Sequence, residues 1–197
     1  MIFVKRRSGS RSWHVGHKDL PFVSASNSHN GYVNLDHSGA NNTSNGGRAN
    51  IPNATTFQGQ DGNGYTMLAY CFHSVDGYSK VGSYTSNSNN DGPFVYTGFK
   101  PAFVMCKSAS YSNSETFWVI HDNERPGYNV TNLQLYANSS LAEAQREDGG
   151  GSNNTKIDFL SNGFKWRDST WSGNASNGST YIYIAFAETP FKYSNAR

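Results

Sequence analysis

The amino-acid sequence predicts an all-β protein made of two related antiparallel β-sandwich units, jelly-roll or lectin-like, with long polar loops. Three observations carry this prediction. Aromatic residues make up 14% of the 197 residues, apolar runs are short, and the segments between them are rich in Asn, Ser and Gly. Aromatic and β-branched residues favour strands, and Gly, Asn, Asp and Ser favour turns. The same order of strand-like blocks also occurs twice along the chain.

The expected strands are short segments with alternating or continuous apolar residues, bounded by turn-forming residues. The segment 141–147, LAEAQRE, follows the cap candidates Asn138, Ser139 and Ser140 and predicts a helical turn. Many short strands at close spacing are typical of sandwiches and jelly rolls. The expected strands are 1–5, 12–16, 31–36, 54–58, 65–73, 79–84, 94–99, 102–107, 115–121, 132–137, 156–166 and 180–187.

An internal repeat with a period of about 100 residues connects the two halves. MIFVKRRSGSRSWHVGHKD and FVMCKSASYSNSETFWVIHDNE share an order of apolar strand, basic end, polar loop, Trp strand, His and Asp. We expect a first unit at 1–85 and a second at 86–197, packed on the first, with 80–84 and 94–99 bridging them. The matched residues are Ile2 with Val104, Lys5 with Lys107, His17 with His121, Leu35 with Leu135, and Tyr65, Leu68, Ala69 and Tyr70 with Tyr181, Ile184, Ala185 and Phe186.

The second unit has a lead-in segment, GPFVYTGFKP, before its first long strand, and the first unit starts directly with its strand. Two explanations are open: the chain is the tail of a longer ancestor, or a neighbouring chain supplies the missing strand. Unpaired edge strands invite partners. The predicted inter-subunit edge is therefore the first strand, with Ile2, Phe3, Val4 and Lys5.

Charge and hydropathy point to a protein without a polyanionic partner or a membrane span. The net charge is +2, and 15% of the residues are charged. The basic residues Lys5, Arg6, Arg7 and Arg11 fit a solvated strand end better than a nucleic-acid surface. No apolar run approaches the roughly 20 residues of a membrane helix, and no signal peptide is expected. Both cysteines lie in apolar runs and are expected to be buried thiols: Cys71 and Cys106.

Catalytic and metal-binding patterns are weak, and we expect no enzyme and no cofactor. His14 and His17 lie three apart, which places them on opposite faces of a strand. The cluster from His121 to Glu124 fits capping side chains better than an acid–base pair. Calcium could be bound by oxygen ligands at Asp61-Gly-Asn63 or at 90–92, but Asp-Gly and Asn-Gly sequences more often form turns.

Aromatic side chains in polar loops are the best candidates for receptor contacts. Tryptophan and tyrosine offer an apolar face for sugar rings at a low entropy cost, and Asn and Asp can bind hydroxyl groups. The core tryptophans are expected to be Trp13, Trp118 and Trp166, whereas Trp171 could pack under its loop or bind a ligand. The candidate contact residues are Trp171, Tyr111, Tyr128 and Tyr32.

Four segments carry a family resemblance: 69–107, beginning AYCFHSVDGYSKVG; DNERPGYN; LSNGFKWR; and TYIYIAFAETPFKYSNAR. They resemble the C-terminal region of large virion and tail-fibre-like proteins of marine tailed bacteriophages. In such proteins this region often follows a concanavalin-like, laminin-G-type lectin domain. The resemblance spans nearly the whole chain and is weakest at 21–60.

The resemblance implies a non-enzymatic virion protein, exposed on the particle, with other phage virion proteins as partners. A tail-fibre adhesin that contacts a host surface glycan is the leading expectation, with a homotrimer as the oligomer by family analogy. A capsid decoration or head-fibre protein is the alternative. A glycan-depolymerising tail enzyme is the third possibility, and it would require two facing carboxylates at glycosidase distance.

Overall fold

A computed structural model describes most of the chain. The described residues are 1–20, 22–24, 29–40, 49–50, 55–57, 64–111, 116–125, 129–143, 156–169 and 171–190, with the backbone alone for 22–24, 29–30, 49–50 and 171–172. The fold is an all-β sandwich, as predicted, in which every strand pair is antiparallel. The one helix in these residues is a single turn, α1 (Trp171–Asn174).

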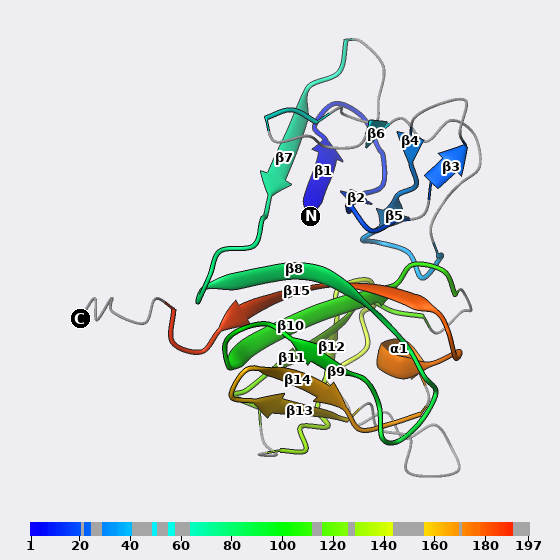
Figure 1. The fold of residues 1–197 in the computed structure, drawn as a ribbon. Helices are drawn as coiled ribbons and strands as arrows, with labels where there is room; N and C mark the ends of the chain where they lie inside the picture. The colour runs from blue at the N-terminus through cyan, green and yellow to red at the C-terminus, as the bar shows by residue number, and fades with distance from the viewer. Residues whose placement is uncertain are drawn as a thin grey trace.

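Three layers of sheet make up the molecule (Figure 1). The central sheet has the strand order β12-β11-β10-β15-β8, with β12 (Leu135–Tyr136), β11 (Val119–Asp122), β10 (Pro101–Ser108), β15 (Thr180–Ala187) and β8 (Ser79–Thr85). The N-terminal sheet has the order β5-β2-β1-β7, with β5 (Val33–Asn34), β2 (His14–Gly16), β1 (Ile2–Arg6) and β7 (Met67–Cys71). The third sheet has the order β13-β14-β9, with β13 (Ile157–Leu160), β14 (Gly163–Trp166) and β9 (Phe94–Tyr96).

A small fourth sheet, which the sequence pattern did not predict, pairs three short strands of the Asn-rich region. Its order is β3-β4-β6, with β3 (Phe22–Ser24), β4 (His29–Asn30) and β6 (Ala49–Asn50). In Figure 1 these strands lie beside the N-terminal sheet, at the end of the molecule opposite the third sheet.

The central sheet contributes to two apolar cores, one on each of its faces. Side chains alternate between the two faces of a strand. Along β15, Tyr181 and Tyr183 belong to the core shared with the third sheet, whereas Ile182 and Ile184 belong to the core shared with the N-terminal sheet. All four are at most 3% exposed. Both neighbouring layers are therefore held by apolar burial against one sheet.

The repeat predicted from the sequence is visible in the topology. Strands β5, β2, β1 and β7 follow one another across the N-terminal sheet as β12, β11, β10 and β15 do across the central sheet. The hairpins match in detail: Lys5 Nζ donates to the carbonyl of Arg11, and Lys107 Nζ donates to the carbonyl of Thr116. Each acceptor lies two residues before a tryptophan, Trp13 or Trp118.

The strand registers correct part of the sequence alignment. Ile2 matches Val104 and Lys5 matches Lys107, as predicted. The other predicted matches are wrong by one or two residues, because loop lengths differ between the halves. The observed counterparts are Gly16 for His121, Ala137 for Leu35, and Ile182 for Leu68.

The position of β1 contradicts the predicted inter-subunit edge. Ile2, Phe3 and Val4 pair with β2 on one side and with β7 on the other, and Lys5 also pairs with β7. The strand is central and its backbone groups are used within the sheet. The sequence could not show this, because the strand that covers β1, residues 67–71, is more than 60 residues away along the chain.

The boundary between the two units also differs from the prediction. Strand β8 was assigned to the first unit, but it pairs with β15 at the edge of the central sheet. Strand β9 lies in the third sheet, so β8 and β9 do not pair with each other, and the two units are joined by packing between sheets. The change of unit thus falls between Cys71 and Ser79, not at residue 85.

Smaller differences concern single segments. The predicted strand 156–166 is a hairpin of two strands, and residues 55–57 form no strand. Residues 141–143 are not helical, and the rest of the predicted turn at 141–147 lies outside the described residues. Cys106 is buried as predicted, whereas Cys71 is exposed, because β7 lies at a sheet edge.

Candidate functional site

The outer face of the third sheet displays two large aromatic side chains. Strand β9 alternates, so that Val95 is buried in the core and its neighbours Phe94 and Tyr96 point outward. Phe94 is 46% exposed and Tyr96 is 61% exposed. The two rings lie two residues apart on one face of the strand and form an exposed apolar patch, the kind of surface that marks contact with a ligand or partner.

Charged side chains lie on the same face, next to the aromatic rings. Lys165 is the cross-strand neighbour of Phe94 on one side and of Asp158 on the other. Lys165 Nζ lies 2.7 Å from Asp91 Oδ1, and Arg167 Nε lies 2.5 Å from Asp158 Oδ2. The hydrogen bond from Lys165 lowers the pKa of the Asp91 carboxyl. Asp158 is buried and Asp91 is exposed, so the network places one accessible carboxylate, Asp91, and two cations, Lys165 and Arg167, beside the rings.

Gly163 makes this arrangement possible. It is the cross-strand partner of Tyr96, and a Cβ at this position would lie 2.2 Å from the carbonyl oxygen of Val95 and 3.0 Å from the Phe94 ring. Any side chain would push β9 away from β14.

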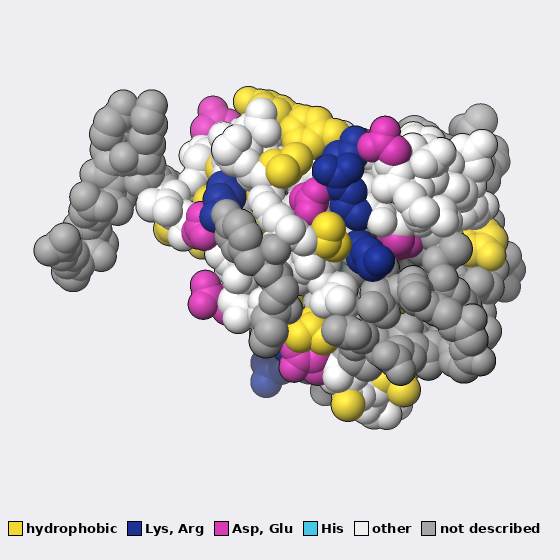
Figure 2. Space-filling model, turned by 90° about the horizontal axis from the view of Figure 1, so that it is seen from below, with side chains coloured by type: hydrophobic (Ala, Val, Ile, Leu, Met, Phe, Trp, Pro, Cys, Tyr) yellow, Lys and Arg dark blue, Asp and Glu magenta, His cyan; other side chains and the backbone are white. Residues whose placement is uncertain are grey.

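Figure 2 shows the molecule from the side on which the third sheet lies in Figure 1. Hydrophobic side chains gather next to a row of Lys and Arg side chains, with acidic side chains between them. Aromatic rings can stack on the apolar faces of sugars, while carboxylate, ammonium and guanidinium groups can hydrogen-bond to hydroxyl groups. We call Phe94, Tyr96, Asp91, Lys165 and Arg167 the aromatic–charged face.

The aromatic residues predicted as contacts are scattered. Tyr32 is half-buried beside β5, with its ring centroid 4.7 Å from that of His14. Tyr111 is half-buried in the β10–β11 connection, where its N–H donates to Ser108 Oγ. Trp171 is the first residue of α1, but its side chain lies outside the described part of the chain, as does all of Tyr128.

The predicted core tryptophans are confirmed in two cases out of three. Trp118 and Trp166 are fully buried, and Trp118 Nε1 donates to the carbonyl of Asn34 at 2.8 Å. Trp13 is only half-buried and stacks on Tyr70 with ring centroids 6.2 Å apart.

Among the residues considered as weak candidates for metal binding or catalysis, His17 and His121 are buried and Asp122 caps a turn. His17 is buried, and burial lowers its pKa to about 4; its Nδ1 accepts a hydrogen bond from the Asp19 N–H. His121 is fully buried, not in a loop, and burial lowers its pKa to about 4. Asp122 caps the following turn, because its Oδ1 accepts hydrogen bonds from the N–H groups of residues 124 and 125.

The segment 87–92 is a turn, the interpretation that the sequence favoured over a calcium loop. Asn87 and Asn89 each accept a hydrogen bond from an N–H two residues later, and Asp91 is paired with Lys165. The other calcium candidate, around Asp61, lies outside the described residues. Within the described part of the chain, no group of three or more potential metal ligands comes together, and no helix is long and apolar enough to cross a membrane.

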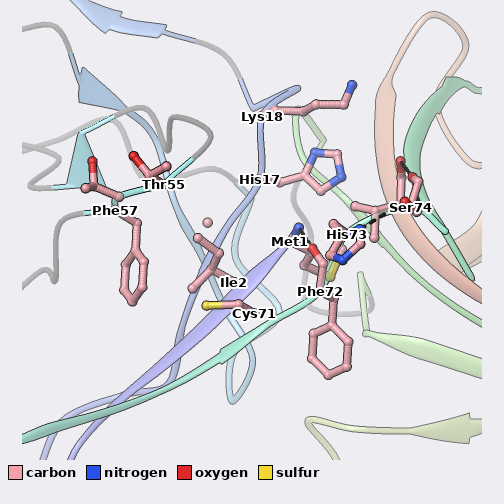
Figure 3. A pocket seen from close by; sticks show the side chains of 13 residues that line it. Met1, Ile2, His17, Lys18, Thr55, Phe57, Cys71, Phe72, His73 and Ser74 are labelled. Carbon is pink, nitrogen blue, oxygen red and sulfur yellow. Dashed lines mark hydrogen bonds between the residues drawn. The ribbon is translucent and has the colours of Figure 1, made fainter.

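A cavity of about 480 Å³ lies between the N-terminal sheet and residues 55–57. Figure 3 shows Ile2 and Cys71 on one side of this space and the Phe57 ring across from them. His17 and Phe72 also line it. Most of the lining is apolar, and the cavity adjoins the exposed edge of β7.

Sequence reasoning missed Phe94 and Tyr96 as candidate contacts. Their alternation, Phe-Val-Tyr, predicts a strand with one face buried, but it does not say which face. When a strand has two aromatic residues on one face and a valine on the other, the aromatic face would ordinarily be expected to be the buried one. The glycine at position 163 was the available signal, since a strand glycine often marks the close approach of another backbone.

A family model described as "Domain of unknown function (DUF7483)" matches residues 1–190. The chain belongs to this family. The match spans both halves of the repeat and all four sheets described above, so the DUF7483 domain is the whole layered unit and not one of its sheets. No curated protein matches the chain, and no solved structure matches it.

Proposed function

We propose that this DUF7483 protein is a non-enzymatic structural protein of a bacteriophage particle that contacts the host surface through its aromatic–charged face. The observation that carries the proposal is the pair of exposed rings, Phe94 and Tyr96, beside fixed charges. The resemblance to tail-fibre-like proteins supports the setting. A bacterial surface glycan is the ligand class that fits aromatic stacking combined with hydroxyl recognition.

The charges on this face favour binding over hydrolysis. A glycosidase needs one protonated carboxyl near neutral pH as a general acid. Asp91 has a lowered pKa because Lys165 donates to it, and Arg167 lies between Asp91 and Asp158. Both acids are thus paired with cations, and the exposed Asp91 suits hydrogen bonding to hydroxyl groups.

The first test is direct binding. Saturation-transfer NMR of the purified protein with bacterial lipopolysaccharide and capsular polysaccharide should give transfer to sugar protons. Tyr96→Ala and Phe94→Ala should each weaken this signal at least 10-fold, whereas Tyr65→Ala, which removes a comparably exposed ring elsewhere, should not. Equal loss in all three variants, or no transfer to any polysaccharide, would contradict the proposal. Release of reducing ends during the incubation would favour the enzymatic alternative.

The second test is the location on the particle. Immunogold labelling of intact virions with an antibody to this chain should mark the tail or its fibres. Label spread over the head would replace the adhesin with the capsid decoration or head-fibre protein, the second candidate. That candidate draws on a different feature, the outer edge of β7, with which no other described strand pairs, because a decoration protein must dock onto another subunit. A homotrimer remains an expectation from family analogy.

A further inference from the structure

The outer edge of β7 pairs with no other strand among the described residues. Hydrogen bonds from Arg7 N to Thr66 O and from Phe72 N to Met1 O fix the phase of the β1–β7 ladder. In an antiparallel pair, alternate residues direct their N–H and C=O groups to opposite sides of the strand. Residues 66, 68, 70 and 72 therefore face β1, while Met67, Ala69 and Cys71 face outward. Among the described residues, β7 pairs only with β1.

The counterpart of this edge in the central sheet is occupied. By the register of the repeat, Met67, Ala69 and Cys71 correspond to Tyr181, Tyr183 and Ala185 of β15. Those three residues pair with β8, and the bonds Ser86 N to Ser179 O and Ala187 N to Tyr78 O set the phase of that ladder. The protein thus contains its own example of an antiparallel strand at this position.

The cavity beside β7 also has an occupied counterpart. Its residues Met1, Ile2, Gly16 and Cys71 correspond to Phe103, Val104, His121 and Ala185 in the second half.

In the second half, the chain between β9 and β10 closes this region. Residues 97 and 98 donate to the Asn162 carbonyl, and Phe99 is buried in the core with Val104 and Ala185. The first half shows a cavity of about 480 Å³ instead, and cavities of about 150 Å³ already accept a benzene ring.

We propose that the β7 edge and the adjoining cavity together form an acceptor site for a strand donated by a partner polypeptide. The donated segment runs antiparallel to β7 over its five residues, as β8 does on β15. A large apolar side chain farther along the segment enters the cavity, as Phe99 does in the second half. Main-chain hydrogen bonds supply affinity in this mode of recognition, and the side-chain pocket supplies specificity.

The exposed side chains of β7 fit this role. Leu68 and Tyr70, on the core-facing side of the strand, are 40% and 49% exposed, and no described strand lies beyond them in the sheet. A donated strand would place its own side chains next to both. Cys71 is exposed and lines the cavity, so its thiol reports on whether the site is filled.

The decisive experiment supplies the donor in the same chain, where the effective concentration is high. A copy of residues 79–102 is placed directly ahead of Met1, which keeps the spacing that β8 and Phe99 have to Phe103. We expect hydrogen exchange at the amides of Met67, Ala69 and Cys71 to slow at least 10-fold. The reaction of the Cys71 thiol with a disulfide reagent should slow by a similar factor, while the buried Cys106 stays unreactive throughout.

Two matched controls separate the edge from the cavity. A copy carrying Gly82→Pro removes the N–H opposite Ala69 and should abolish the amide protection. A copy carrying Phe99→Ser should keep the amide protection at Met67 and Ala69 but restore most of the reactivity of Cys71. Both extensions have the length of the first, so an effect of length alone would appear in all three proteins.

Several outcomes would overturn the proposal. The intact extension could leave exchange at the three amides unchanged. The unextended monomer could already protect Met67, Ala69 and Cys71 as well as it protects Leu68 and Tyr70, which bond to β1. Protection that rises with protein concentration would assign the edge to a second copy of this chain. None of these results bears on glycan binding, which involves the opposite end of the molecule.

Discussion

Lys107 allows a sharp test of the layered architecture, because its charge is buried between two sheets. The side chain is fully buried on β10, and Nζ donates to the carbonyls of Ser38 and Thr116, at 2.7 Å each. Ser38 belongs to the N-terminal unit, so this lysine connects the two halves of the repeat. Burial lowers the pKa of Lys107 from 10.5 to about 7.

The sign of the effect follows from linkage. Between about pH 7 and 10.5 the unfolded chain holds a proton on Lys107 that the folded protein has released, so stability rises with pH across this window. Below pH 7 both states are protonated and the contribution levels off. Integrating the two titrations from pH 7 to 8.5 gives a gain of about 2 kcal/mol in the free energy of unfolding.

Urea denaturation of the unsubstituted protein and of Lys107→Met, at pH 7, 7.75 and 8.5, measures this gain. The difference in the free energy of unfolding between the two proteins should change by about 2 kcal/mol across this range. Lys5→Met removes the lysine at the equivalent place of the N-terminal sheet and controls for the loss of one positive charge. Burial raises the pKa of Cys106 to about 12, which costs stability above pH 9, but both proteins share this thiol.

Parallel pH dependences of the unsubstituted protein and Lys107→Met would refute the reasoning. They would mean that the two carbonyl acceptors stabilise the ammonium ion enough to cancel the effect of burial on its pKa. If the free energy of unfolding rose more steeply with pH in Lys107→Met than in the unsubstituted protein, the predicted sign of the Lys107 contribution would be wrong.

Three further predictions concern single side chains. In urea denaturation, Gly163→Ala should lower the free energy of unfolding by about 1–3 kcal/mol, because its Cβ would meet the Val95 carbonyl at 2.2 Å. Gly39→Ala, with open space around it, should change the free energy of unfolding by no more than about 0.5 kcal/mol. Trp118→Phe should cost about 2 kcal/mol, since it leaves a cavity and an unpaired carbonyl in β5; an unchanged urea midpoint would contradict this. Asn174→Ala should cost about 3 kcal/mol and lower the melting temperature by roughly 6–12 °C, because it removes hydrogen bonds that join α1 to the β8–β9 connection and to the carbonyl of Asp168. A shift below about 2 °C would be inconsistent with that role.

Local patterns in the sequence predicted the strands well where one face is buried. Strands β1, β7, β10 and β15 lie within one or two residues of the expected segments. The repeat was also visible, because a strand, its basic end and a Trp strand recur in order. Its residue matches slipped by one or two positions, since equal residue types were aligned across loops of unequal length. Hydrogen bonds such as Leu35 N to Trp13 O and Ala137 N to Trp118 O fix the true register.

Long-range pairing was the part that local patterns could not supply. The sequence shows that 1–5 is a strand, but whether it is an edge depends on where β7 pairs, and that is decided by closure of a long loop. The same limit applies to Phe94 and Tyr96. Their exposure depends on the burial of Val95 by the central sheet, which no local pattern encodes.

The two sheets related by the repeat, the central sheet and the N-terminal sheet, differ in what covers their faces and edges. The central sheet is covered on both faces and has β8 along the edge of β15. In the N-terminal sheet, no described strand lies along the outer edge of β7, and a cavity lies beside it. The aromatic–charged face lies at the opposite end, on the third sheet (Figure 1).

A protein docked through β7 would therefore still present Phe94 and Tyr96 outward. A subunit with one docking end and one binding end fits an adhesin better than a cement protein, which needs docking surfaces on two sides. If both ends prove to bind particle proteins, the decoration assignment becomes the stronger one.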